Sequence, residues 1–323
     1  QLIVALGAAA LGLPLTAYAQ AKVWRLGYLD FGSRKTMVDS GRHAALIEGL
    51  RERGYVEGKN WVFEARFADG NADRLHGLAA ELVQQKADVI LSSGTVASHA
   101  AQRAATTIPI VVTNVGDPVK EGLAASLARP GGNVTGMSSA TGDTVQKLVE
   151  LLIVAAPRLK RIAVLNNPTV STQATLLPRV QAAAKQAGKT VLPLGVHTLE
   201  EIERAFTTMA RERADAVIIF ADAFFLQHRA RIAALALQHR LPSIYPQAQY
   251  AEAGGLMSYG ADLNDNFRRA GIFVEKILKG AKPGELPFEQ PTRFYLVINR
   301  KTANALGVKL NNELLTRAER VIE

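Results

Sequence analysis

Side chains that could bind a small molecule follow several short apolar runs of this chain, at the point where each run ends. In an open sheet of parallel strands, ligands bind outside the carboxyl ends of the strands. If the apolar runs are such strands, the hydroxyls, amides, carboxylates and aromatic ring that follow them converge on one ligand site. The candidate ligand-binding residues are Phe31, Ser33, Ser93, Gly94, Thr95, Asn114, Asp117, Asn167, Asp222 and Tyr259.

The segment Ser93–Gly94–Thr95 is the most informative candidate, because it joins an apolar run to a predicted helix. Gly94 lets backbone come close to a ligand, and the first turn of a helix offers free N–H groups and a partial positive charge. A carboxylate suits such a place. The competing interpretation is that Ser93 or Thr95 only caps its own helix. The position at a strand end favours a ligand site.

Two carboxylates have both a structural and a binding interpretation. Asp117 precedes Pro118, and this pair is typical of a helix start, so capping is favoured over recognition of a ligand ammonium group. Asp222 precedes another predicted helix, and both interpretations stay open for it.

Sequence motifs of enzymes are absent from the chain. It contains no glycine-rich dinucleotide or phosphate-binding motif, no His-Glu-x-x-His and no Gly-x-Ser-x-Gly. It has no Cys, which excludes thiol chemistry and thiolate metal sites. The six His are dispersed, and none lies three or four residues from another. We therefore expect neither an enzyme nor a metal or other cofactor.

From residue 25 on, short apolar runs alternate with amphipathic stretches, and a second round of this pattern begins at residue 161. Such alternation predicts parallel sheets with right-handed crossovers and helices on both faces. We predict strands over 25–29, 61–67, 88–91, 108–113, 162–166, 190–194 and 216–220, and helices over 39–53, 72–86, 95–104, 172–187, 199–213, 223–238 and 264–279.

The two rounds predict an α/β protein of two Rossmann-like lobes with parallel sheets, joined by a hinge of three segments. Pro130 and the glycines within Arg129–Gly136 cannot continue a helix and suit a chain that crosses between lobes. The other two hinge segments are Ser258–Gly260 and Arg293–Asn299. The predicted N-terminal lobe is 22–138 plus 262–291, and the C-terminal lobe is 139–261 plus 292–323.

Residues 1–19 carry no charge and lead into Thr16–Gln20, which is typical of the apolar core and Ala-x-Ala cleavage site of a secretory signal peptide. A retained membrane anchor is the alternative, but the small residues at the end and Pro14 favour cleavage. Without Cys, a lipid-attachment site and a disulfide framework are both excluded. We therefore expect a periplasmic protein.

The formal net charge of +9 and a sequence pI near 9.8 raise the question of nucleic-acid binding. The basic residues are scattered in ones and twos on the polar sides of predicted helices, without aromatic residues between them on which bases could stack. We therefore expect no nucleic-acid partner.

Several motifs together resemble one family, the periplasmic substrate-binding proteins of ABC importers of the tryptophan/tyrosine type, which are related to the Leu/Ile/Val-binding proteins. The motifs cover nearly the whole chain after the leader, and the combination of Gly-Asp-Pro with Pro-Gly-Gly-Asn-Val-Thr-Gly is the most specific part. They are Glu57–Asn60, Ile108–Val112, Gly116–Pro118, Pro130–Gly136, Ser258–Gly260 and Val297–Asn299.

The resemblance implies a type I periplasmic-binding fold whose lobes close on a small molecule, with amino acids, above all aromatic ones, as cargo. It also implies that Ser93, Thr95, Asp117 and Asp222 lie near the ligand. The chain departs from the amino-acid binders at Asp222–Phe225, where two Phe replace a polar turn. This pair is expected to enlarge the pocket or exclude water from it. An α-amino acid is then less expected as the ligand, and an aromatic carboxylate remains a candidate.

The resemblance favours a monomeric binding protein that delivers a carboxylate-bearing solute to the membrane permease and ATPase of an ABC importer. A ligand-sensing effector domain of a regulator with the same fold is the alternative, but a leader occupies the place where a helix-turn-helix would be expected. A hydrolase or dehydrogenase on an α/β scaffold is disfavoured by the missing motifs.

Overall fold

The computed structural model of this chain describes residues 22–139 and 141–323. The predicted signal peptide at residues 1–19 lies outside the described residues. Within the described ranges, none of the helices combines the length and the apolar character that crossing a membrane requires.

The first sheet consists of parallel strands in the order β2-β1-β3-β4-β5. Its strands are β1 (Trp24–Asp30), β2 (Trp61–Phe67), β3 (Val89–Ser93), β4 (Ile110–Val115) and β5 (Val134–Ser138), and its helices are α1 (Arg34–Asp39), α2 (Arg42–Arg51), α3 (Arg74–Gln84), α4 (Thr95–Ala104) and, from late in the chain, α11 (Leu263–Leu278). We call this unit the first lobe.

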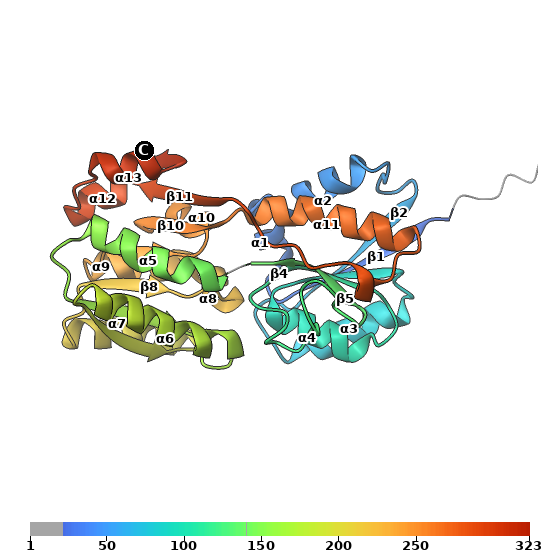
Figure 1. Ribbon diagram of the computed structural model, residues 1–323, viewed down its shortest axis with the longest axis horizontal. Helices are drawn as coiled ribbons and strands as arrows, with labels where there is room; N and C mark the ends of the chain where they lie inside the picture. The colour runs from blue at the N-terminus through green and yellow to red at the C-terminus, as the bar shows by residue number, and fades with distance from the viewer. Residues whose placement is uncertain (1–21, 140) are drawn as a thin grey trace, which may run out of the picture.

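Side chains of the first sheet alternate between its two faces, as the pleat of a strand requires. Leu29 and Ile90 pack with α3 and α4 in one apolar cluster. Their neighbours Tyr28 and Leu91 pack with α2 and α11 in another cluster on the opposite face. Figure 1 shows these two helix layers above and below the sheet. The carboxyl ends of the strands are thereby held between two packed layers.

The second sheet has the order β12-β11-β10-β9-β8-β6-β7. Its strands are β6 (Arg161–Asn166), β7 (Thr190–Gly195), β8 (Ala216–Ile219), β9 (Ser243–Tyr245), β10 (Met257–Ala261), β11 (Phe294–Asn299) and β12 (Arg320–Ile322), and its helices are α5 (Thr141–Ala155), α6 (Ser171–Gln186), α7 (Leu199–Arg211), α8 (Ala223–Gln227), α9 (Arg229–Gln238), α10 (Ala248–Glu252), α12 (Arg300–Leu306) and α13 (Asn312–Arg317). We call this unit the second lobe.

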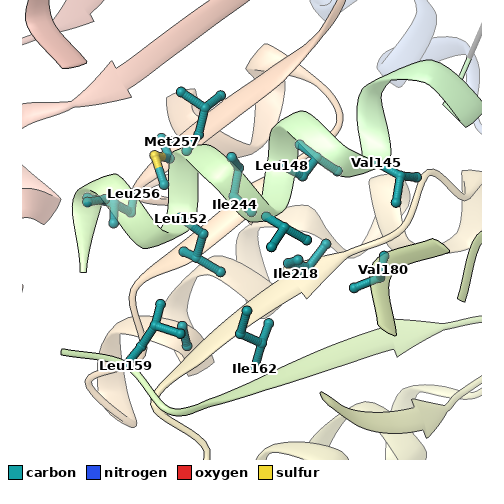
Figure 2. Close-up of a cluster of buried hydrophobic side chains, with 14 of the residues drawn as sticks. Val145, Leu148, Leu152, Leu159, Ile162, Val180, Ile218, Ile244, Leu256 and Met257 are labelled. Atoms are coloured by element: carbon teal, nitrogen blue, oxygen red, sulfur yellow. The ribbon is translucent and has the colours of Figure 1, made fainter. Parts of the chain in front are cut away.

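The second lobe has an apolar cluster on each face of its sheet, and helix α5 forms one of them. Leu148 and Leu152 of α5 pack over Ile162 of β6 and Ile218 of β8, as Figure 2 shows. All of these side chains are buried. The predicted α/β architecture of two sheets with helices on their faces is confirmed, but the second sheet is not all parallel: β11 runs antiparallel to β10, and β12 follows the direction of β11. Two predicted hinge segments are strands of this sheet, since Ser258–Gly260 lies in β10 and all of Arg293–Asn299 except its first residue forms β11.

Two predicted helices differ from the structure. The helix predicted over 39–53 begins only at Arg42, as α2, because Gly41 before it has a left-handed φ of 77°, and α1, which ends at Asp39, was not predicted. The helix predicted over 223–238 is divided at His228 into α8 and α9. The ring of Phe224 packs edge-on against His228 at 4.6 Å between centroids, which fixes this bend.

The prediction that Arg129–Gly136 crosses between lobes is wrong, because β5 begins at Val134 and completes the edge of the first sheet. Gly136 is required there by close approach: a Cβ at this position would lie 2.1 Å from the carbonyl oxygen of Val112 on the neighbouring strand.

Within the described residues, the two lobes are joined after β5, between β10 and α11, and before β11 (Figure 1). The outgoing and returning segments run side by side, because Ser138 N–H donates to Glu289 and Glu289 N–H donates to Gly136. This pairing brings the connections together on one side of the space between the lobes.

Candidate functional site

A cleft lies between the lobes and is lined by residues that follow the strands of both sheets. From the first lobe it takes Asp30, Phe31, Arg42, Ser93, Gly94, Thr95 and Asn114. From the second lobe it takes Gln173, Leu176, Asp222, Leu226, Gln227 and Gln247. The cleft therefore contains candidates that are far apart in sequence.

The first turn of α4 forms one end of the cleft. Gly94 occupies the N-cap position with a φ of 84°, and among the described residues no side chain caps this helix. Ser98 donates its backbone N–H to the Gly94 carbonyl at 3.1 Å and its hydroxyl to the same carbonyl at 2.8 Å. The N–H groups of Thr95, Val96 and Ala97 precede this first bond of the helix, and all three residues line the cleft. Neither Ser93 nor Thr95 caps α4 within the described structure, so the competing capping interpretation does not hold.

A carboxylate of the second lobe, Asp222, lines the opposite side of the cleft. It caps α8 by accepting the N–H of Phe225 at 3.0 Å, and it accepts a second hydrogen bond from Asn167 at 3.0 Å. Burial raises the pKa of the Asp222 carboxyl, while these hydrogen bonds oppose the increase. Gln173 accepts the N–H of Asn167 and donates to the carbonyl of Ala221, so it fixes both segments around the carboxylate. Asp222 is thus both a cap and a cleft residue.

Asp30, directly after the apolar core of β1, is a buried carboxylate with its own hydrogen bonds. The phenol of Tyr28 donates to it, and so does Gly32 N–H at 2.6 Å. Burial, followed by the charge of Asp30, raises the pKa of Tyr28 well above its usual value. Because Asp30 is engaged in this way, its role is to fix the turn that presents Phe31 to the cleft.

Arg42, the first residue of α2, is a cation of the cleft wall. Only 5% of it is exposed, and its Nε and Nη2 atoms have no hydrogen-bond partner within the described residues. Its guanidinium carbon lies 5.8 Å from the centre of the Phe267 ring. The cleft wall therefore contains a buried cation with two of its three nitrogens unused.

Two sequence candidates of the first lobe lie outside the cleft lining and act locally. Ser33 caps α1 by accepting the N–H of Thr36 at 3.2 Å. Asp117 accepts the N–H groups of Val119 and Lys120, each at 3.2 Å, so it caps a turn; the helix that was expected to start there is not formed.

Two candidates of the second lobe also lie outside the cleft lining. Asn167 lies behind Asp222 and orients it. Tyr259 stacks on Phe294 with ring centroids 6.0 Å apart, next to the connection into α11. The remaining candidates, which are Phe31, Ser93, Gly94, Thr95, Asn114 and Asp222, line the same cleft.

The lobes touch each other beside the cleft. Gln227 donates to the carbonyl of Asp69 at 3.5 Å, and Phe224 packs against apolar clusters of both lobes. Phe225 is fully buried within the second lobe. The expectation that the two Phe shape the pocket directly is wrong, because Ala223 and Leu226 line the cleft in their place.

Sequence reasoning missed several polar cleft residues, among them Arg42, Gln173 and Gln247. Arg42 and Gln173 lie in predicted helices, where a polar residue ordinarily faces solvent. Gln247 lies in a segment for which no element was predicted. No local signal in the sequence separates these residues from the solvated ones.

Comparisons with known proteins agree with this geometry. A sequence model of the family described as ABC transporter substrate binding protein matches residues 39–322. A tyrosine-binding protein of Clostridioides difficile (strain R20291) is 27% identical over 263 residues, which are 81% of this chain and 75% of that protein.

Two solved structures resemble the chain over nearly its whole length. A domain from Streptococcus pneumoniae in complex with L-Trp is 26% identical with a TM-score of 0.86, and the match covers 93% of this chain and 100% of that one. A conserved domain protein from Vibrio cholerae is 29% identical with a TM-score of 0.86 and the same coverage. The family expected from the motifs is confirmed: the chain belongs to the ABC transporter substrate-binding proteins.

Proposed function

We propose that this protein is the extracytoplasmic solute-binding component of an ABC importer and that it captures an amino acid or a related aromatic acid between its lobes. Family membership supports a role in substrate binding over an enzymatic one. One observation carries the choice of solute: the uncapped first turn of α4 and the carboxylate of Asp222 line the same cleft from opposite lobes.

A zwitterion matches these two groups. Its carboxylate accepts hydrogen bonds from the free N–H groups of α4, where the helix dipole favours negative charge. Its ammonium group pairs with Asp222: each oxygen of this carboxylate already accepts a hydrogen bond, but a carboxylate offers about four acceptor sites, so lone pairs remain for the ligand. An amino acid therefore bridges the lobes and favours their closure.

An aromatic side chain suits the rest of the cleft. Phe31, Leu176 and Leu226 supply apolar walls. The Clostridioides relative is named for tyrosine, and the Streptococcus domain holds L-Trp. We infer that the preferred solute of this chain is likewise an aromatic amino acid or an aromatic carboxylate.

Closure links capture to delivery. The open lobes admit the solute, and closing makes contacts such as those of Gln227 with Asp69 and of Phe224 with the first lobe. The closed protein then docks as a monomer on a membrane permease, whose ATPase drives import. This role places the protein in the periplasm, after cleavage of the leader.

Calorimetry on the purified protein tests the proposal with L-tryptophan, L-tyrosine and L-phenylalanine, and with tryptamine, which lacks the carboxylate. We expect at least one of the amino acids to bind with a Kd of about 1 μM, which is roughly −8 kcal/mol, and to raise the melting temperature by mass action. Tryptamine should bind far more weakly. Failure of all three amino acids, or equal binding of tryptamine, contradicts the proposal.

A further inference from the structure

Arg42 is the one charged side chain of the cleft wall that has donors left over in the described structure. It lines the cleft, is 95% buried, and has neither Nε nor Nη2 in a hydrogen bond with a described residue. A buried ionised group without a partner is strongly disfavoured, and guanidinium cannot escape by losing its proton. An anion arriving from outside the chain would satisfy it.

Arg42 forms no ion pair within the described residues, although the carboxylates of Asp30 and Asp222 line the same cleft. The carboxylate of Asp30 is engaged by Tyr28 and by Gly32 N–H. The ring of Phe267 lies 5.8 Å from the guanidinium carbon, near the limit for a cation–π contact. Such a contact stabilises the cation, but the ring accepts no hydrogen bond from the N–H groups in the plane of the guanidinium.

We propose that Arg42 binds a second anionic group of the solute, so that the preferred ligand carries two acidic groups. This inference rests on the proposed function, in which the first carboxylate binds the uncapped turn of α4. Arg42 begins a different helix, α2, so the two places can take different groups of one molecule. The planar fork of Arg suits a carboxylate, which it can bind through two parallel hydrogen bonds.

The charge of the whole chain agrees with an acidic solute. The formal net charge is +9, and residues 1–19 contribute nothing to it. The positive charge of the protein attracts anions within about one Debye length of its surface and raises the rate at which they associate. A solute with two acidic groups gains more from it than a neutral zwitterion.

Matched pairs of ligands test the inference by isothermal titration calorimetry. The probes are 4-carboxy-L-phenylalanine against L-phenylalanine, and L-glutamate against L-glutamine. In the wild-type protein we expect at least one acidic member to bind about tenfold or more tightly than its neutral partner, as charge-assisted hydrogen bonds allow. In Arg42→Gln this preference should disappear, so that the ratio of the two Kd values falls to about 1.

Two further measurements keep the test decisive. Arg42→Lys retains the charge without the planar fork, so it should keep part of the preference. Removing an unpaired buried charge should leave the melting temperature of unliganded Arg42→Gln unchanged or higher. If Arg42→Gln does not fold, the ratios of Kd within each ligand pair, measured for the wild-type protein and for Arg42→Lys, decide whether Arg42 binds a second anionic group.

The outcomes separate the inference from the proposed function. Equal affinities of the paired ligands in the wild-type protein, or a preference that survives in Arg42→Gln, overturns the role of Arg42 while capture of amino acids stands. Failure of every probe and of the aromatic amino acids overturns both.

Discussion

Replacing Asp222 by Asn should weaken the binding of amino acids without unfolding the protein. The change keeps the size of the side chain, and Asn caps a helix as well as Asp does. It removes the charge that we pair with the solute ammonium group. A charge-assisted hydrogen bond of this kind is worth about 1.5–3 kcal/mol, so the Kd should rise about 10- to 150-fold.

The remaining effect on the fold is small for two opposing reasons. The amide of Asn cannot accept from both Phe225 and Asn167, which costs about 1 kcal/mol. Against this, burial raises the pKa of the native carboxyl, so that ionised Asp222 destabilises the unliganded protein. This contribution is absent below the unfolded pKa near 3.8 and grows as the pH rises through the raised folded pKa. The Asn variant should lack that dependence on pH.

Titration calorimetry with L-tryptophan and indole-3-propionate measures the effect, because the second ligand lacks the ammonium group. Asp222→Asn should weaken L-tryptophan only. The control is Asp117→Asn, which alters a carboxylate that caps a turn outside the cleft lining and should leave both affinities unchanged. An equal loss for both ligands, or no loss for either, would refute the pairing of Asp222 with the ammonium group.

Three further predictions follow from local geometry. Gly94→Ala forces a side chain into a backbone conformation of φ 84° and ψ 160°, which glycine alone adopts readily, at a cost of about 1–3 kcal/mol. By disturbing the α4 turn it should weaken carboxylate ligands in calorimetry, and unchanged binding would show that this turn is not used. Gly70→Ala places a Cβ 2.6 Å from the side chain of Gln227, so it should hinder closure of the lobes and raise the radius of gyration of the liganded protein in X-ray scattering. The control is Gly58→Ala, which has a similar φ but no atom near its Cβ and should leave the radius of gyration unchanged. Leu152→Ala in the core of the second lobe should cost about 2–5 kcal/mol in chemical denaturation, and a cost under about 1 kcal/mol would contradict the packing described for it.

Much of the fold follows from short-range signals. The helix predicted over 95–104 and the strand predicted over 61–67 agree with α4 and β2, because Gly94 and the apolar runs mark them locally. Long-range pairing is different. The strand β5 was not predicted, because Gly136 indicates a turn when only its neighbours in sequence are considered. The actual reason for this glycine is the close approach of Val112 on the neighbouring strand. The antiparallel direction of β11 likewise depends on contacts between distant segments.

The candidate site shows the same division. Asp117 and Asp222 have one local signature, an Asp before a predicted helix start, yet only Asp222 caps a helix and lines the cleft, because the second lobe brings it opposite the first. Arg42 lies in an amphipathic stretch where the pattern indicates a solvated charge, and only tertiary packing buries it. The sequence therefore predicts that the residues after strands, as a group, contribute to the ligand site. Which of them line the cleft depends on how the two lobes pack against each other.

A crystal structure of the protein with L-tryptophan tests the central claim most directly. It should place the ligand carboxylate about 3 Å from backbone N–H groups in the first turn of α4, and the ligand ammonium group within hydrogen-bond distance of Asp222. A ligand bound outside the interlobe cleft, or one with its carboxylate turned away from α4, would contradict the account.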